Sequence, residues 1–264
     1  MATSVWGNIL ANINTWCDVA TSAVGAHALH QITVKSGQVA AGVDQVAATL
    51  PEHYVAAHHL ARVLRRQGKP QAAALVEERL PTTKQIRSGD LGEILGVAYV
   101  NELTDYEIGV FRLQWKDHRN MAMRGDDLIG IAQGDDGRAY FLKGEAKSGA
   151  NMAAATITAA RTALAGAEER PTPHALLFLS EKYLSAGRPE ICDLIDEATL
   201  DRTLDLDQVE HLMFTFTGNS AGGLLTTDLQ NYAGTVSQIA VNFHIPTHQN
   251  FIQSVFDTVI ANAR

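Results

Sequence analysis

Acidic residues and one lysine stand close together in residues 124–148, at spacings that could build a site for phosphate chemistry. Glu145 and Lys147 are two positions apart, so on an extended strand both side chains project from the same face. Asp126 and Asp127 precede an apolar run, from which a hairpin would return the chain beside them. Carboxylates are hard ligands for Mg²⁺, and a bound metal polarises a phosphate and activates water. The arrangement suits hydrolysis of a phosphodiester, in which Lys147 would orient the nucleophile or offset negative charge.

The segment between these residues predicts the β-hairpin that would bring them together. Residues 128–132 and 139–142 are apolar runs, and the intervening Gly-Asp-Asp-Gly of residues 134–137 is typical of a tight turn. A simpler interpretation is a surface salt bridge between Lys147 and a neighbouring carboxylate, worth about 0–1 kcal/mol. The aspartate before the first strand, the turn and the small residues after the lysine favour the catalytic interpretation.

Three short motifs, in order over about sixty residues, resemble a known family. They are Ser-Gly-Asp-Leu-Gly-Glu-Ile-Leu (88–95), Lys-Asp-His-Arg-Asn-Met-Ala-Met-Arg-Gly-Asp-Asp (116–127) and Gly-Glu-Ala-Lys-Ser (144–148). The last two are similar to the pattern of the PD-(D/E)xK nuclease superfamily. All three together resemble the HamA family, the nuclease component of the Hachiman antiphage defence system. The resemblance implies a restriction-endonuclease-like α/β fold, in which helices flank a mixed central sheet.

By this resemblance the protein would be a metal-dependent endonuclease that cleaves DNA. Asp127 and Glu145 would hold Mg²⁺, for which Mn²⁺ would substitute, and Lys147 would complete the catalytic set. Asp126 is a second candidate ligand, but Asp127 is preferred because it immediately precedes the apolar strand. Glu93 has two interpretations that stay open here. It is either a metal ligand from the first helix of the nuclease fold or the acid of an N-terminal helix capping box.

The resemblance also implies a partner, the superfamily 2 helicase HamB, which would restrain the nuclease and release it on sensing invading or damaged DNA. The chain has no Walker motif of its own, which is compatible with that dependence. The alternative function is a catalytically silent DNA-binding or helicase-docking module, although the intact acidic residues and lysine argue against it. Four basic residues near the acids are candidates for contact with the DNA backbone: Lys116, Arg119, Arg124 and Lys143.

Composition narrows the class of protein. The 264 residues are 46% hydrophobic and 19% charged, as in an ordinary globular protein. Two cysteines far apart in sequence fit a reducing compartment, and we expect neither a signal peptide nor a membrane span, so the predicted location is cytoplasmic. The net charge of −8 argues against a protein that simply coats DNA. Residues 60–88, however, hold seven Lys/Arg residues and two acids. This stretch is either a basic strip near the site or an ordinary solvated surface.

Hydrophobic periodicity predicts a helical N-terminal region over residues 1–80, and the resemblance implies a nuclease domain over residues 81–264. In the first region, helical spacing covers 17–30, 38–49, 54–66 and 70–80. In the second, we expect, besides the hairpin, a linker over 81–87, a helix over 90–102, a strand over 107–115, a helix to about 166, a strand over 174–180, a helix over 187–198, a strand over 211–217 and helices over 227–241 and 246–262.

Two competing motifs fit less well. Residues 218–222, Gly-Asn-Ser-Ala-Gly, match the nucleophile elbow of α/β-hydrolases, but too little chain follows them for the remaining units of that fold. His244 and His248 have the spacing of a zinc pair, but Pro246 interrupts the helix and no Glu adjoins either histidine. We therefore expect neither a serine hydrolase nor a zinc protease.

Overall fold

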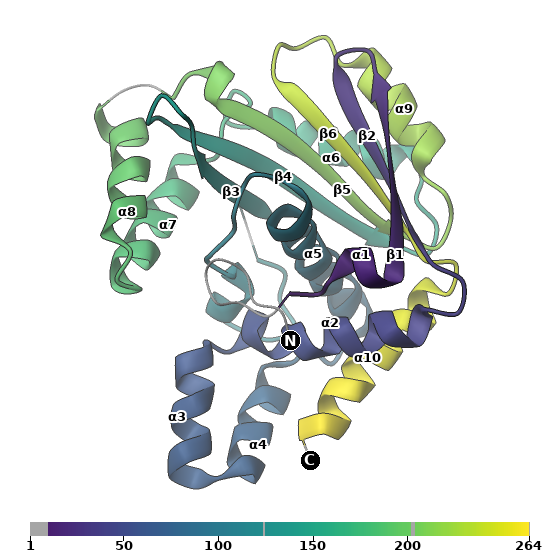
Figure 1. Ribbon diagram of the computed structural model, residues 1–264, viewed down its shortest axis with the longest axis vertical. Coiled ribbons are helices and arrows are strands. Elements are labelled where there is room, and N and C mark those ends of the chain that lie inside the picture. Colours follow the sequence, from purple (N-terminus) through teal and green to yellow (C-terminus); the bar gives the residue numbers. More distant parts are fainter. Residues whose placement is uncertain (1–9, 124, 202–203, 264) are drawn as a thin grey trace.

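A mixed β-sheet forms the centre of the protein, and the computed structural model describes it within residues 10–123, 125–201 and 204–263 (Figure 1). Within those residues the sheet has six strands in the order β1-β2-β6-β5-β4-β3. Strands β2, β6, β5 and β4 run parallel to one another, and β1 and β3 are antiparallel edge strands. The strands are β1 (Cys17–Val24), β2 (His27–Val34), β3 (Leu128–Gln133), β4 (Ala139–Gly149), β5 (Val209–Thr217) and β6 (Ser237–His244). The predicted α/β fold with a mixed central sheet is confirmed.

Helices cover both faces of this sheet (Figure 1). Helices α1, α2, α5 and α10 bury their apolar residues against one face, and α6, α7, α8 and α9 pack on the other. None of the helices in the described part of the chain is long and apolar enough to cross a membrane. The helices are α1 (Ile13–Trp16), α2 (Val39–Tyr54), α3 (Ala57–Gln67), α4 (Lys69–Arg79), α5 (Lys84–Leu103), α6 (Ala154–Ala165), α7 (Pro173–Ser185), α8 (Pro189–Asp196), α9 (Gly222–Asn231) and α10 (His248–Ala263).

The N-terminal region departs from the prediction at its start. Residues 17–30, expected to be helical, belong to the β1–β2 hairpin, which turns at Gly25 with a φ of 62°. Alanines gave this segment a helical pattern, but its β-branched residues and its glycine turn favour strands once a sheet edge is present. Strand β2 pairs in parallel with β6, so the sheet includes residues from both sides of the proposed boundary at residue 80.

Two predicted strands are wrong. Residues 107–115 contribute only one isolated bridge and then a short 3-10 helix, Arg112–Trp115. Residues 174–180 lie in helix α7, whose first residue is Pro173. A short apolar run does not distinguish a buried strand from a buried helix, and proline at the first helical position favours the helix. The parallel neighbour of β4 is instead β5, reached through α6, α7 and α8.

The C-terminal part is corrected in the same way. The helix expected over 227–241 is two elements, because α9 ends at Asn231 and strand β6 begins at Ser237. The other expected helices exist with shifted ends, and the expected linker over 81–87 is partly helical because α5 begins at Lys84. The expected strand over 211–217 is confirmed as part of β5.

The predicted β3–β4 hairpin is confirmed, and its register decides which side chains meet. Leu128 pairs with Gly144, so Asp127 lies one position before the ladder and opposite Glu145. Residues directly opposite each other in an antiparallel pair project to the same side of a sheet. The turn closes at Gly137, which has a φ of 80° and therefore favours glycine.

Helix α5 packs unusually close to this hairpin. A Cβ on Gly96 would lie 2.7 Å from Leu128 Cδ1, and one on Gly144 would lie 2.8 Å from Leu128 Cβ. The two glycines therefore leave room for the leucine, and the helix approaches the strands closely. This close approach brings Glu93 of α5 to the beginning of β3.

Candidate active site

The hairpin brings three of the predicted catalytic residues together. Asp127 Oδ2 accepts a hydrogen bond of 3.1 Å from the Ala146 amide, which fixes this carboxylate beside β4. On β4, Lys147 Nζ donates to Glu145 Oε1 at 2.5 Å. Burial, and then the neighbouring charge of Asp127, raise the pKa of the Glu145 carboxyl. Asp127, Glu145 and Lys147 thus form one electrostatic cluster, as the sequence predicted.

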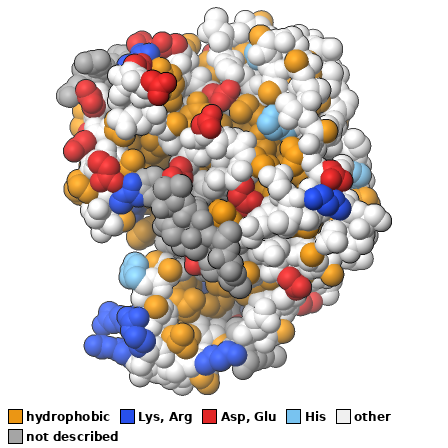
Figure 2. Space-filling view, viewed as in Figure 1, with side chains coloured by type: hydrophobic (Ala, Val, Ile, Leu, Met, Phe, Trp, Pro, Cys, Tyr) orange, Lys and Arg blue, Asp and Glu red, His pale blue; other side chains and the backbone are white. Residues whose placement is uncertain are grey.

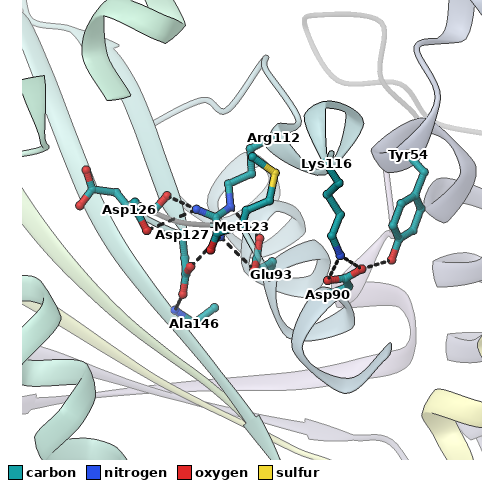
Figure 3. Close-up of polar contacts among 10 residues, drawn as sticks. Tyr54, Asp90, Glu93, Arg112, Lys116, Met123, Asp126, Asp127 and Ala146 are labelled. Carbon is teal, nitrogen blue, oxygen red and sulfur yellow. Dashed lines mark hydrogen bonds and ion pairs between the residues drawn. The ribbon is translucent and has the colours of Figure 1, made fainter. Parts of the chain in front are cut away.

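Arg112, which the sequence analysis did not identify, joins Glu93 to Asp127 (Figure 3). Its Nε lies 2.8 Å from Glu93 Oε2, and its Nη2 lies 2.9 Å from Asp127 Oδ1. Nη1 donates to the carbonyl of Asp126 at 2.6 Å. In the sequence, Arg112 is a lone cation in the apolar and aromatic stretch Val-Phe-Arg-Leu-Gln-Trp. This pattern could mark the residue, but the direction of its side chain depends on the fold.

Glu93 does not cap its helix. The N-cap of α5 is Thr83, whose side chain accepts from the Ile86 amide, and Asp90 lies inside the helix. The capping-box interpretation is therefore wrong, because the helix begins earlier than the sequence suggested. Burial raises the pKa of the Glu93 carboxyl, Arg112 opposes that shift, and Asp127 adds to it. Glu93 instead belongs to the acidic cluster around Asp127.

Asp126 points away from the carboxylate of Asp127 (Figure 3). Its Oδ2 accepts a hydrogen bond of 2.7 Å from the Thr172 amide, and its Oδ1 lies 3.8 Å from Lys143 Nζ. The two aspartates therefore contact different residues, and Asp127 is the one that faces Glu93 and Arg112.

Two of the basic residues expected to contact DNA have their amines inside the protein. Lys143 is 2% exposed and donates to the carbonyls of Leu164 and Gly166. Lys116 is 8% exposed, and both carboxylate oxygens of Asp90 lie 2.8 Å from its Nζ. Neither lysine presents its charge at the surface, because each finds internal oxygens within reach.

The other two expected contacts have different outcomes. Arg119 is partly exposed and lies along α4, where its Nη1 is 3.3 Å from the Glu78 carbonyl. It can still face a solvent-borne anion. Arg124 lies outside the described residues. Of the four expected residues, Arg119 is therefore the one whose charge lies at the surface in the described part of the chain.

The comparison with protein families gives a match over nearly the whole chain. The model of the HamA family matches residues 12–259, a range that includes the acidic cluster and Lys147. The chain belongs to the HamA family. This family is a component of the Hachiman defence system. A comparison with curated proteins found no match.

In this HamA-family site the carboxylates outnumber the cations. Three carboxylates, on Glu93, Asp127 and Glu145, face the two cations of Arg112 and Lys147. With all five ionised the cluster carries a surplus negative charge. Asp127 and Glu145 offer the two carboxylates through which Mg²⁺ usually binds, with water completing the shell. In the described residues no group of three or more acids, histidines or cysteines is arranged to hold a metal.

Proposed function

We propose that this HamA-family protein is a metal-dependent endonuclease that cleaves DNA and acts as the effector of a helicase-coupled defence system. The observation that supports the proposal is the convergence of Asp127, Glu145 and Lys147 at the start of one hairpin. A cavity of about 250 Å³ adjoins Asp127 and Arg112, which leaves room for a phosphate group beside Asp127.

Each residue has a role that follows from its contacts. Asp127 and Glu145 would hold Mg²⁺, or Mn²⁺ in its place, and the metal would polarise a phosphate and activate water. Lys147 lies beside Glu145, where its ammonium group orients the attacking water or offsets charge on the phosphate oxygens. Arg112 holds Glu93 and Asp127 in place, so it acts as a positioning residue. Glu93 would join the metal only if Arg112 released it.

A catalytically silent DNA-binding or helicase-docking module is the second candidate. The specific observation in its favour is that Arg112 already forms ion pairs with two of the carboxylates. In that case the cluster would be a structural ion-pair network. Lys147, whose ammonium group pairs with Glu145, favours the enzyme. Membership of the HamA family supports HamB, a superfamily 2 helicase, as the partner in either case.

A plasmid digest tests the enzyme proposal. The protein is incubated with supercoiled plasmid and Mg²⁺ or EDTA, alone and with the purified partner helicase and ATP. We expect Glu145→Ala and Lys147→Ala to lower the cleavage rate at least ~100-fold, the usual scale for removing a preorganised charged group. Glu181→Ala and Lys35→Ala, matched changes outside the cluster, should cleave like wild type.

The outcomes separate the two candidates. Cleavage by Glu145→Ala at the wild-type rate would contradict the catalytic assignment. A wild-type protein that cleaves under neither condition, with helicase and ATP present, would support the silent module.

A further inference from the structure

We propose that a basic cleft between the α3–α4 hairpin and α7 binds a single strand of nucleic acid and leads it to Asp127. The inference deepens the proposed function and rests on it for the destination of the strand. It depends on charge, on an exposed aromatic ring and on lining residues that the cleft shares with the hollows next to Asp127.

The cleft has a volume of about 650 Å³ and cations on both walls. Arg62 of α3 and Arg79 of α4 line one side, and Lys182 of α7 lines the other. His58 and His59 also face it, and Glu52 is the acidic residue of the lining. Cations on two opposing walls suit a polyanion that lies along the cleft.

The surrounding hairpin concentrates positive charge in an acidic protein. Both Glu77 and Glu78 lie on α4, but the basic residues outnumber them and are exposed: Arg62, Arg65, Arg66, Lys69 and Arg79. Figure 2 shows blue Lys and Arg side chains gathered at the lower left, where Figure 1 places α3 and α4. Because the whole chain carries a net charge of −8, this hairpin is a local positive patch. Such a patch attracts phosphates and releases counterions when they bind.

An exposed tryptophan favours a nucleic acid over an acidic peptide as the ligand of the cleft. Trp115 lines the cleft and is 45% exposed. Lys182 Nζ lies 3.8 Å from its ring centroid, and the edge of the ring contacts Phe178. A flat, supported aromatic ring among cations is the arrangement on which unpaired bases stack, at about 1–3 kcal/mol per base. Acidic peptides need the cations but have no such use for the ring.

The cleft borders the cavity beside Asp127. Trp115 also borders a second hollow of about 470 Å³, whose lining includes Met123. Met123 in turn lines the cavity that contains Arg112 and Asp127, and Phe178 lines that cavity as well. Val110 is shared by the cleft and this cavity. A strand stacked on Trp115 therefore lies next to the cavity that Asp127 lines.

Fluorescence anisotropy in EDTA tests the cleft without requiring cleavage. The full chain is titrated against a fluorescein-labelled 20-nucleotide single strand, the matching duplex and a 20-residue poly-Glu peptide. We expect the single strand to bind more tightly than the duplex or the peptide. Arg62→Glu combined with Arg79→Glu should weaken single-strand binding at least ~10-fold, because two phosphate contacts become repulsive.

Two further variants examine the ring and the specificity of the charge change. Trp115→Ala should weaken binding about 5-fold or more, and Trp115→Phe should recover most of the loss, as base stacking requires. Arg138→Glu, at the tip of the β3–β4 hairpin, makes the same type of charge change away from the cleft and should leave binding within about twofold.

The results that overturn the proposal are distinct from failure of the enzyme assignment. No binding of the single strand, or equal loss in Arg138→Glu and the double variant, rejects the cleft. Tighter binding of the peptide assigns the cleft to a protein partner and rejects it as well. Binding of the single strand with no cleavage in the plasmid digest would contradict the enzyme and support the cleft.

Discussion

Helix α5 presents two carboxylates, one turn apart, to cations of the same short segment, and the two pairs differ in their surroundings (Figure 3). Asp90 pairs with Lys116, and its Oδ2 accepts a 2.7 Å hydrogen bond from the Tyr54 hydroxyl. The side chains of this ion pair are 4–5% exposed. Glu93 pairs with Arg112 at 14–16% exposure, beside a cavity and a further carboxylate. The first pair is closed and balanced, and the second is open.

The difference separates a structural ion pair from a candidate reactive one. A buried pair of opposite charges, in which both carboxylate oxygens are hydrogen-bonded, needs no further ligand. A cluster with more carboxylates than cations, next to a cavity, favours the entry of another cation. The same helix therefore anchors the segment through Asp90 and supplies the site through Glu93.

The largest effect should come from breaking the closed pair. Asp90→Ala leaves the Lys116 charge buried without its partner, which should lower the free energy of unfolding by about 3–5 kcal/mol. Urea denaturation followed by circular dichroism measures the change. Restoring balance with Asp90→Leu and Lys116→Met together should recover most of it, and Asp117→Ala, at an exposed neighbour, should change little. Equal stability of Asp90→Ala and wild type would remove the contrast.

A smaller effect on stability should come from lowering the pH, through His53, which adjoins Tyr54 of the closed pair. His53 stacks on Phe111, and burial lowers its pKa to about 3. Because the unfolded histidine titrates near 6.5, acid protonates the unfolded state first, so stability falls as the pH drops below about 6.5. Between pH 7 and pH 5 this should remove about 2 kcal/mol.

The control for this effect is a variant that cannot titrate at that position. The unfolding free energies of wild type and His53→Gln should converge by that amount as the pH falls. A constant difference between the two proteins would show that His53 is not held neutral in the folded state.

The smallest effect on stability should come from the open pair. Glu93→Gln keeps a side chain of the same shape, Arg112 retains Asp127, and burial already raises the pKa of Glu93 to about 7, so the free energy of unfolding near pH 7 should change by less than about 1 kcal/mol. The measurement is the same denaturation series as for Asp90→Ala. A loss as large as that of Asp90→Ala would make Glu93 a structural residue and would erase the distinction between the two pairs.

The local part of the site was predictable from the sequence, because its residues belong to one hairpin. The alternation of side chains on β4 places Glu145 and Lys147 together, and a glycine turn sets the register with Asp127. Arg112 was not predictable, because its segment is a 3-10 helix positioned by packing rather than the expected strand. Lys116 and Lys143 looked like surface cations, since composition does not show that a long amine reaches internal oxygens.

The fold was predictable in class but not in every element. The parallel strand β5 and the helices α2, α3, α4 and α10 follow their sequence patterns. The segment of α7 was mistaken for a strand because a short apolar run fits both structures. The β1–β2 hairpin was missed because its strands depend on β6, some two hundred residues later in the chain. Tertiary pairing, rather than local preference, decides such segments.

The central claim is that Asp127 and Glu145 share one divalent cation, and an anomalous difference map from a crystal soaked in Mn²⁺ tests it most directly. We expect one peak about 2.1 Å from a carboxylate oxygen of each residue, the distance typical of small divalent ions. The peak should disappear in Glu145→Ala crystals soaked in the same way. A wild-type map with no peak between these carboxylates would contradict the account.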